Sequence, residues 1–135
     1  MSTIQEKPQP AIAPRHFPAQ TAYVTAPSEL MEMLERAPEH VFVIDIRDPE
    51  IFDGGHIPGA RNIHLEDLIT ACSEVPKDRT VVIYCEDVSC GLSLWAALEL
   101  AQLGFCAKYL HGGLAEWSRR EFPIEISPPP PAPEY

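Results

Sequence analysis

Short apolar runs alternate with amphipathic stretches along this chain, and this alternation limits the fold more than any other feature. VFVIDI (41–46) and TVVIYC (80–85) are nearly continuous apolar runs, the pattern of strands buried on both faces. Weaker strand candidates are AYVT (22–25), RNIHL (61–65) and AKYL (107–110). Helical patterns cover SELMEMLER (28–36), LEDLITAC (65–72), GLSLWAALELAQLGF (91–105) and GLAEWSRR (113–120). The alternation predicts an α/β fold, with a mainly parallel sheet and helices on both faces.

Smaller signals refine the helices. Asp48 followed by Pro49 is typical of a helix start, because Asp favours the N-cap position and Pro the first turn. Gly104 is well placed to end the third predicted helix as its C-cap residue. Trp95 and Trp117 fall at helical spacing, and we expect both in the core.

Fifteen prolines are spread unevenly and mark the two ends of the chain. They recur in residues 1–20 and in the terminal SPPPPAPEY, a composition that favours extended polyproline II. We expect residues 1–21 and 127–135 to be tails and residues 22–126 to fold as one domain. The C-terminal tail is either a plain solvated extension or a ligand for an SH3-like groove.

The formal net charge of the chain is −10, and the acidic residues lie mainly in the predicted domain. Nucleic acids and anionic membrane surfaces attract Lys and Arg, so this charge argues against both as partners. No apolar run approaches the roughly 20 residues of a membrane span. The first residues also lack the order of a signal peptide. These features predict a cytoplasmic protein.

The chain has four cysteines, and in a reducing compartment we expect all of them to be free thiols. Cys85 ends the second strong strand run, at the edge of a parallel sheet where ligands bind. Cys90 follows five positions later, and no His lies within twenty residues of the pair, which argues against a zinc site. Cys72 and Cys106 are expected to be packing residues. We expect no metal and no cofactor.

Three segments, taken in order, resemble the rhodanese-homology family over about residues 22–126. They are VIDIRDPEIFDGGHIPGARNIHL (43–65), VVIYC (81–85) and LHGGLAEWSRREFPIE (110–125). The resemblance implies a five-stranded parallel sheet wrapped by helices. It also implies a cysteine that takes sulfane sulfur from a donor, becomes a persulfide and passes the sulfur to a thiophilic acceptor. Two departures are Glu121, where Gly is usual, and His64, where Pro or Ser is common.

The loop after Cys85 departs from the C-R-x-G-x-R-S that is usual among sulfurtransferases of this family. It is two residues longer when aligned on the following helix, and acidic residues stand in place of arginine. Alignment on the helix would place the usual cysteine near Asp87, with Cys90 inside the loop. Alignment on the strand, which we favour, makes Cys85 the nucleophile and Cys90 a second thiol, in a pattern that resembles a C-x-x-x-x-C variant of the family. The other residues of the predicted loop are Glu86, Asp87, Val88, Ser89, Gly91, Leu92 and Ser93.

Physical chemistry supports a thiolate at this position and limits its substrates. The N-terminus of a helix presents unpaired amides that stabilise a thiolate or bind an anion. The family's phosphatase branch carries an Arg six residues after its cysteine, but Gly91 occupies that position here, which argues against phosphatase activity. Glu86 and Asp87 would each repel a dianion by on the order of a few kcal/mol at roughly 4 Å. We therefore expect thiosulfate to be a poor donor, and a neutral or cationic donor or a persulfidated protein to serve, with a thiol as acceptor.

Other residues are expected to support the loop. The resemblance makes Asp45 a carboxylate that bonds loop amides, and Arg47 a bridge to nearby carboxylates. His56, within GHIPGA, is expected to lock its own loop by hydrogen bonding, with general-base catalysis as the less favoured alternative. His64 and His111 lie close to predicted strand ends and could face the pocket.

Three functions stay open. The first is a single-domain sulfurtransferase that acts through a Cys85 persulfide. The second is a thiol–disulfide switch in which Cys85 pairs with Cys90. The third is a catalytically silent binding module whose proline-rich ends are docking or linker segments. The cysteine at the strand end argues against a catalytically silent module, and the lack of basic residues in the loop argues for one.

Overall fold

The computed structural model describes residues 23–87 and 90–127. The predicted tails therefore lie outside the described residues, apart from Ser127. The strands are β1 (Val24–Thr25), β2 (Val41–Asp45), β3 (Arg61–Asn62), β4 (Thr80–Tyr84) and β5 (Cys106–Leu110). The α-helices are α2 (Pro27–Arg36), α3 (Pro49–Asp53), α4 (Leu92–Gln102) and α5 (Gly113–Arg119). Short 3-10 helices are η2 (Pro38–His40), η3 (Leu65–Asp67) and η4 (Thr70–Glu74).

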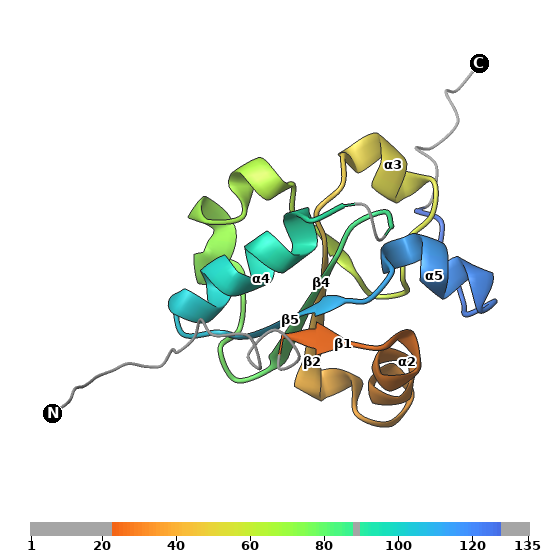
Figure 1. Ribbon diagram of the computed structural model, residues 1–135, viewed down its shortest axis with the longest axis horizontal. Helices are drawn as coiled ribbons and strands as arrows, with labels where there is room; N and C mark the ends of the chain where they lie inside the picture. Colours follow the sequence, from red (N-terminus) through yellow and green to blue (C-terminus); the bar gives the residue numbers. More distant parts are fainter. Residues whose placement is uncertain (1–22, 88–89, 128–135) are drawn as a thin grey trace, which may run out of the picture.

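The strands form one parallel sheet in the order β1-β5-β4-β2-β3 (Figure 1). β4 lies at its centre, and its register with β2 runs from Val41 opposite Thr80 to Asp45 opposite Tyr84. Every residue of β2 is buried, as are the last four residues of β4. The predicted five-stranded parallel α/β fold is therefore confirmed.

Successive residues of the central strands enter two separate cores, because side chains alternate between the faces of a sheet. Helix α4 covers one face, and α2 and α5 cover the other (Figure 1). The α4 side contains Phe42, Ile44, Val81 and Ile83, and the other side contains Val41, Val43, Val82 and Tyr84. Burial of each such side chain stabilises the fold by roughly 1.5–3 kcal/mol.

Several predicted elements are shorter than expected. The strands predicted at 22–25 and 61–65 are reduced to β1 and β3, and the helix predicted at 65–72 is replaced by η3 and η4. Local side-chain bonds explain the last difference: the amide of Glu66 donates to the His64 ring, and the hydroxyl of Thr70 donates to the Asp67 carbonyl.

The helix ends and the two tryptophans give mixed outcomes. Gly104, with a φ of 97°, follows the C-cap residue of α4, so the predicted end of this helix is confirmed. Asp48 is the N-cap residue of α3, but its side chain makes no capping bond. Trp117 is fully buried as predicted, whereas the prediction for Trp95 is wrong, because this side chain is 46% exposed. Within the described segments, no helix combines the length and apolarity needed to cross a membrane.

Candidate active site

Cys85 lies immediately after β4, at the carboxyl edge of the sheet. Its side chain is half-buried and packs against the core on the α4 side. The Cys85 carbonyl accepts a hydrogen bond from the amide of Leu114 (3.0 Å), and the Glu86 carbonyl accepts one from the amide of Ala115 (2.8 Å). The first turn of α5 therefore holds the backbone on both sides of the Cys85–Glu86 peptide.

The pair Gly112–Gly113 allows α5 to begin this close to the loop. Both residues have positive φ, at 77° and 61°, where side chains are strained. A Cβ atom on Gly113 would lie 2.6 Å from the Cys85 carbonyl oxygen, and a Cβ atom on Gly112 would overlap the side chain of Glu116. The two glycines are thus needed both for the turn into α5 and for the close approach of α5 to the Cys85 carbonyl.

Cys85 and Cys90 form a disulfide, with their Cα atoms 6.4 Å apart. The expectation of four free thiols is wrong for this pair, because the fold places Cys90 within bonding distance of Cys85 at the end of β4. Val88 and Ser89 of the predicted loop lie outside the described residues. Cys72 is free, half-buried and packed against the core, as predicted. Cys106 is also free but exposed, so its predicted packing role is wrong.

Arg47 links the loop to β2 through a buried charge network. Its guanidinium donates to both carboxylate oxygens of Asp45, to the Gly55 carbonyl, and to the Glu86 carboxylate at 2.9 Å. Asp45 is fully buried and also accepts from the Arg47 amide at 2.9 Å. Burial lowers the pKa of Arg47, but the bonds to Asp45 and Glu86 outweigh it and raise that pKa, so Arg47 stays charged. Glu86 is therefore paired, which weakens its expected repulsion of an anionic donor.

Tyr84 is a supporting residue that the sequence analysis did not single out. Its hydroxyl accepts from the Ile57 amide at 3.0 Å, and it also bonds the Asp45 carboxylate. Burial, together with the charge of Asp45, raises the pKa of Tyr84 above its usual range, so the phenol stays neutral. The sequence does indicate that Tyr84 is buried, because alternation along TVVIY places it on the same sheet face as Val82.

The two candidate histidines near the loop are both held by partners. The His56 ring is buried, donates from Nδ1 to the Phe52 carbonyl at 2.9 Å and stacks on the Phe52 ring. Its backbone also pairs with Glu125. His64 Nε2 lies 2.8 Å from Asp48 Oδ1, a partner that the sequence did not reveal. Neither ring contacts Cys85 among the interactions of the described residues.

The start of α4 forms the other side of the site. The Cys90 amide donates to the Asp87 carbonyl at 3.1 Å, and Gly91 is the N-cap residue of α4. Ser93 is buried, whereas Leu92 is 48% exposed. The outer surface of this helix turn is therefore apolar, and it adjoins the disulfide.

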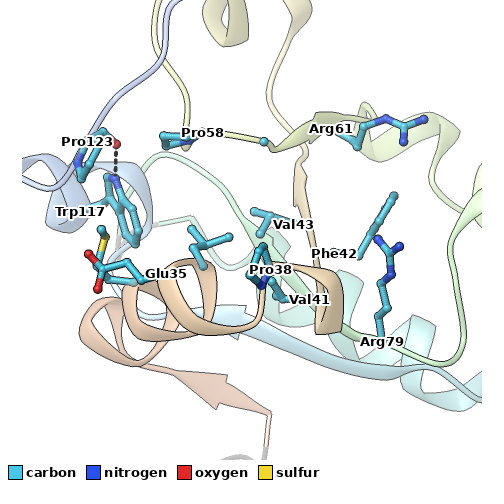
Figure 2. A pocket seen from close by; sticks show the side chains of 13 residues that line it. Glu35, Pro38, Val41, Phe42, Val43, Pro58, Arg61, Arg79, Trp117 and Pro123 are labelled. Carbon is cyan, nitrogen blue, oxygen red and sulfur yellow. Dashed lines mark hydrogen bonds between the residues drawn. The ribbon is translucent and has the colours of Figure 1, made fainter.

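A cavity of about 580 Å³ lies away from the cysteines, between α2, the first half of β2 and Trp117 (Figure 2). Its lining contains no cysteine, histidine or other nucleophile of the predicted site. Arg61 and Arg79 lie at one end of it, beside Phe42 (Figure 2). A large cavity is commonly the first candidate for an active site, but here the cysteine pair lies elsewhere.

The fold and the loop cysteines define an α/β domain with a cysteine pair at the carboxyl edge of a parallel sheet. The sequence model of the rhodanese-like domain matches residues 26–120, and the chain belongs to this family. A sulfurtransferase of Allochromatium vinosum is 39% identical over 87 residues, which are 64% of this chain and 79% of that protein. The thiosulfate sulfurtransferase GlpE of Shewanella oneidensis is 36% identical over 92 residues, covering 67% and 86%.

The structural similarity agrees with this family. The crystal structure of the BH2092 protein from Bacillus halodurans is similar with a TM-score of 0.73 at 29% identity, covering 81% of this chain and 80% of that one. Other relatives are longer: the chain spans 39% of the HTH-type transcriptional regulator Rv0324 of Mycobacterium tuberculosis, which is 33% identical over 89 residues and 66% of this chain. The family therefore includes sulfurtransferases as well as proteins with a regulatory name.

Proposed function

We propose that this protein is a sulfurtransferase in which reduced Cys85 carries sulfane sulfur as a persulfide from a donor to a thiol acceptor. The position of Cys85 carries the proposal: the residue follows the central strand, its backbone is held by α5, and α4 begins shortly after it. The named sulfurtransferases among the relatives support it. A reducing cytoplasm would suit such an enzyme, because the reaction needs the free thiolate.

The chemistry requires two displacements. The Cys85 thiolate attacks the sulfane sulfur of the donor, whose remaining part leaves as a thiolate or as sulfite. An acceptor thiolate then attacks the outer sulfur of the persulfide, and Cys85 leaves as the thiolate. The N-terminus of α4 supplies a dipole that favours negative charge in both steps.

The donor is expected to be neutral or cationic, or a persulfide on a partner protein. Glu86 is offset by Arg47, but the group of Asp45, Arg47 and Glu86 has a net charge of −1, and Asp87 is close in sequence. A relative named as a thiosulfate sulfurtransferase argues the other way. Steady-state rates with thiosulfate and with cysteamine persulfide, whose ammonium group offsets the charge of its sulfur, decide between them. A low KM and a high rate with thiosulfate would contradict the expected preference.

The test of sulfur transfer is the intact mass of the reduced protein after treatment with a sulfane donor. We expect Cys90→Ser to gain the mass of one sulfur and to lose it when a thiol acceptor is added. We expect Cys85→Ser to gain nothing. Uptake by Cys85→Ser, or none by Cys90→Ser with either donor, would reject the proposal.

The disulfide favours a second candidate, a thiol–disulfide switch. In this case a mild disulfide oxidant removes two hydrogens from the reduced protein, either cysteine substitution abolishes the change, and no sulfur is ever bound. A silent binding module is the third candidate, for which the regulatory relative is the support. That candidate predicts no change of mass with either reagent.

A further inference from the structure

We propose that Cys90 is a resolving thiol, which discharges the Cys85 persulfide as hydrogen sulfide and leaves the Cys85–Cys90 disulfide. This inference rests on the proposed persulfide of Cys85 and adds a second catalytic cysteine and a second product to it. The protein would then release sulfide from sulfane sulfur, in addition to passing the sulfur to an external acceptor.

The first support is the geometry of the pair. The two Cα atoms are 6.4 Å apart and the sulfurs are bonded, so Cys90 Sγ reaches Cys85 Sγ, which is the inner sulfur of the proposed persulfide. The Cys85 carbonyl accepts a hydrogen bond from the Leu114 amide, and the Cys90 amide donates one to the Asp87 carbonyl. Each cysteine also adjoins a regular element, β4 or α4. These backbone contacts hold the two cysteines at the end of β4 and just before α4, where their side chains meet.

The second support is that the other thiols are placed elsewhere. Cys106 begins β5, where it is paired with Thr80 at the start of β4, whereas Cys85 follows the end of β4. Because the strands are parallel, Cys106 lies at the opposite edge of the sheet from Cys85. Cys72 lies in η4 and packs against the α4-side core. Cys90 is thus the cysteine that the fold brings to the reactive sulfur.

The reaction balances without an external oxidant. The Cys90 thiolate attacks the inner sulfur of the Cys85 persulfide, the sulfur–sulfur bond of the persulfide breaks, and the outer sulfur leaves with the electron pair as hydrosulfide. The two cysteines are oxidised to the disulfide, and the sulfane sulfur is reduced to sulfide. A dithiol reductant must then reduce the disulfide before the next turnover.

Proximity decides the competition between Cys90 and a free acceptor. Groups joined by a short linker reach an effective concentration on the order of millimolar. A dilute external thiol therefore loses to Cys90, and an acceptor must bind beside the loop to compete. The exposed side chains of Leu92 and Trp95 lie on the first turn of α4, next to Cys90, where such an acceptor would approach.

A single-turnover experiment on the full chain tests the proposal. The protein is reduced, freed of reductant and mixed without oxygen with one equivalent of thiosulfate carrying an isotopic label in its outer sulfur. A parallel sample receives glutathione persulfide labelled in the same position. Trapped sulfide and the intact protein mass are measured over time for the wild type, Cys90→Ser, Cys85→Ser and the matched control Cys106→Ser.

With whichever donor loads Cys85, we expect the wild type and Cys106→Ser to release close to one labelled sulfide per protein and to lose the mass of two hydrogens. We expect Cys90→Ser to keep the added sulfur and to release labelled sulfide only after an external thiol is added. Circular dichroism of each variant verifies the fold.

Each other outcome overturns the inference. A wild type that keeps the added sulfur shows that Cys90 does not resolve the persulfide, while the proposed transfer by Cys85 stands. A wild type that forms the disulfide without labelled sulfide has not formed it through the persulfide, and sulfur uptake by Cys90→Ser then decides whether the proposed transfer stands. Failure of Cys90→Ser to take up sulfur from either donor rejects the proposed function itself. Sulfide release by Cys85→Ser would assign the chemistry to another cysteine.

Discussion

At the scale of single residues, Arg47 connects the stability of the domain to the position of the loop after β4. One guanidinium binds the fully buried Asp45, the Gly55 carbonyl and the Glu86 carboxylate. A charge as deeply buried as Asp45 is tolerated only with a partner. The buried charge of Asp45 therefore requires Arg47 as its partner. Arg47 also bonds Glu86, the residue next to Cys85.

We predict that Arg47→Met destabilises the protein by about 3–5 kcal/mol, because it leaves the Asp45 charge buried and unpaired. Urea unfolding measures the change. The double variant Asp45→Asn/Arg47→Met should recover part of the loss. Arg36→Met is the matched control: Arg36 pairs with Glu32 on the surface, and its loss should cost less than about 1 kcal/mol. Equal losses for the two arginines would contradict the argument.

At the scale of elements, α5 determines where the loop after β4 lies. Its first amides bind the carbonyls of Cys85 and Glu86, and Gly113 leaves no room for a side chain. The contact joins segments that are distant in sequence. Patterns of apolar residues predict each element but not this contact between them.

We predict that Gly113→Ala destabilises the protein and displaces the Cys85 loop. The positive φ alone costs roughly 1–2 kcal/mol for a residue with a Cβ atom, and the contact with the Cys85 carbonyl adds to it. Thermal unfolding and the rate of Cys85 alkylation in the reduced protein measure the two effects. Gly91→Ala is the control, because its φ is −77° and the space around it is open. It should leave both measurements nearly unchanged.

The sequence predicts the central elements well and the irregular ones poorly. VFVIDI and TVVIYC become β2 and β4. Short runs that are apolar at nearly every position are typical of strands in a parallel sheet with helices on both faces. The predicted helix at 65–72 fails because His64 and Thr70 bond backbone groups locally. Trp95 fails because periodicity predicts a helix but not which of its apolar residues face the core, and the buried stripe of α4 is Ser93, Ala96, Ala97 and Leu100.

In the candidate site, too, the residue at the end of a regular element is predicted, and the contacts made through loops are not. The strand end places Cys85, but the paired state of Cys85 and Cys90 depends on the path of a loop that no periodic pattern describes. The partners of Arg47 and His64 also come from other elements, so they are set by the packed fold.

At the scale of the whole molecule, the disulfide restricts the unfolded chain as well as the loop. The five-residue separation of the cysteines closes a small ring, for which the chain-entropy estimate is about 2 kcal/mol of stability. We predict that a reductant lowers the melting temperature of the oxidised protein by about 7–9 °C for a domain of this size. Differential scanning calorimetry measures the shift. Cys90→Ser should melt at the same temperature with and without the reductant, and a shift in this variant would assign the effect elsewhere.

The anchoring of Cys85 by α5 also has a consequence for biosynthesis. Ribosomes make the chain from its N-terminus, so both loop cysteines are synthesised before Leu114 and Ala115, whose amides hold the Cys85–Glu86 backbone. In a nascent chain, the two cysteines therefore emerge before α5 can form its hydrogen bonds to the loop. The loop after β4 can therefore reach its folded position only after the start of α5 has been made.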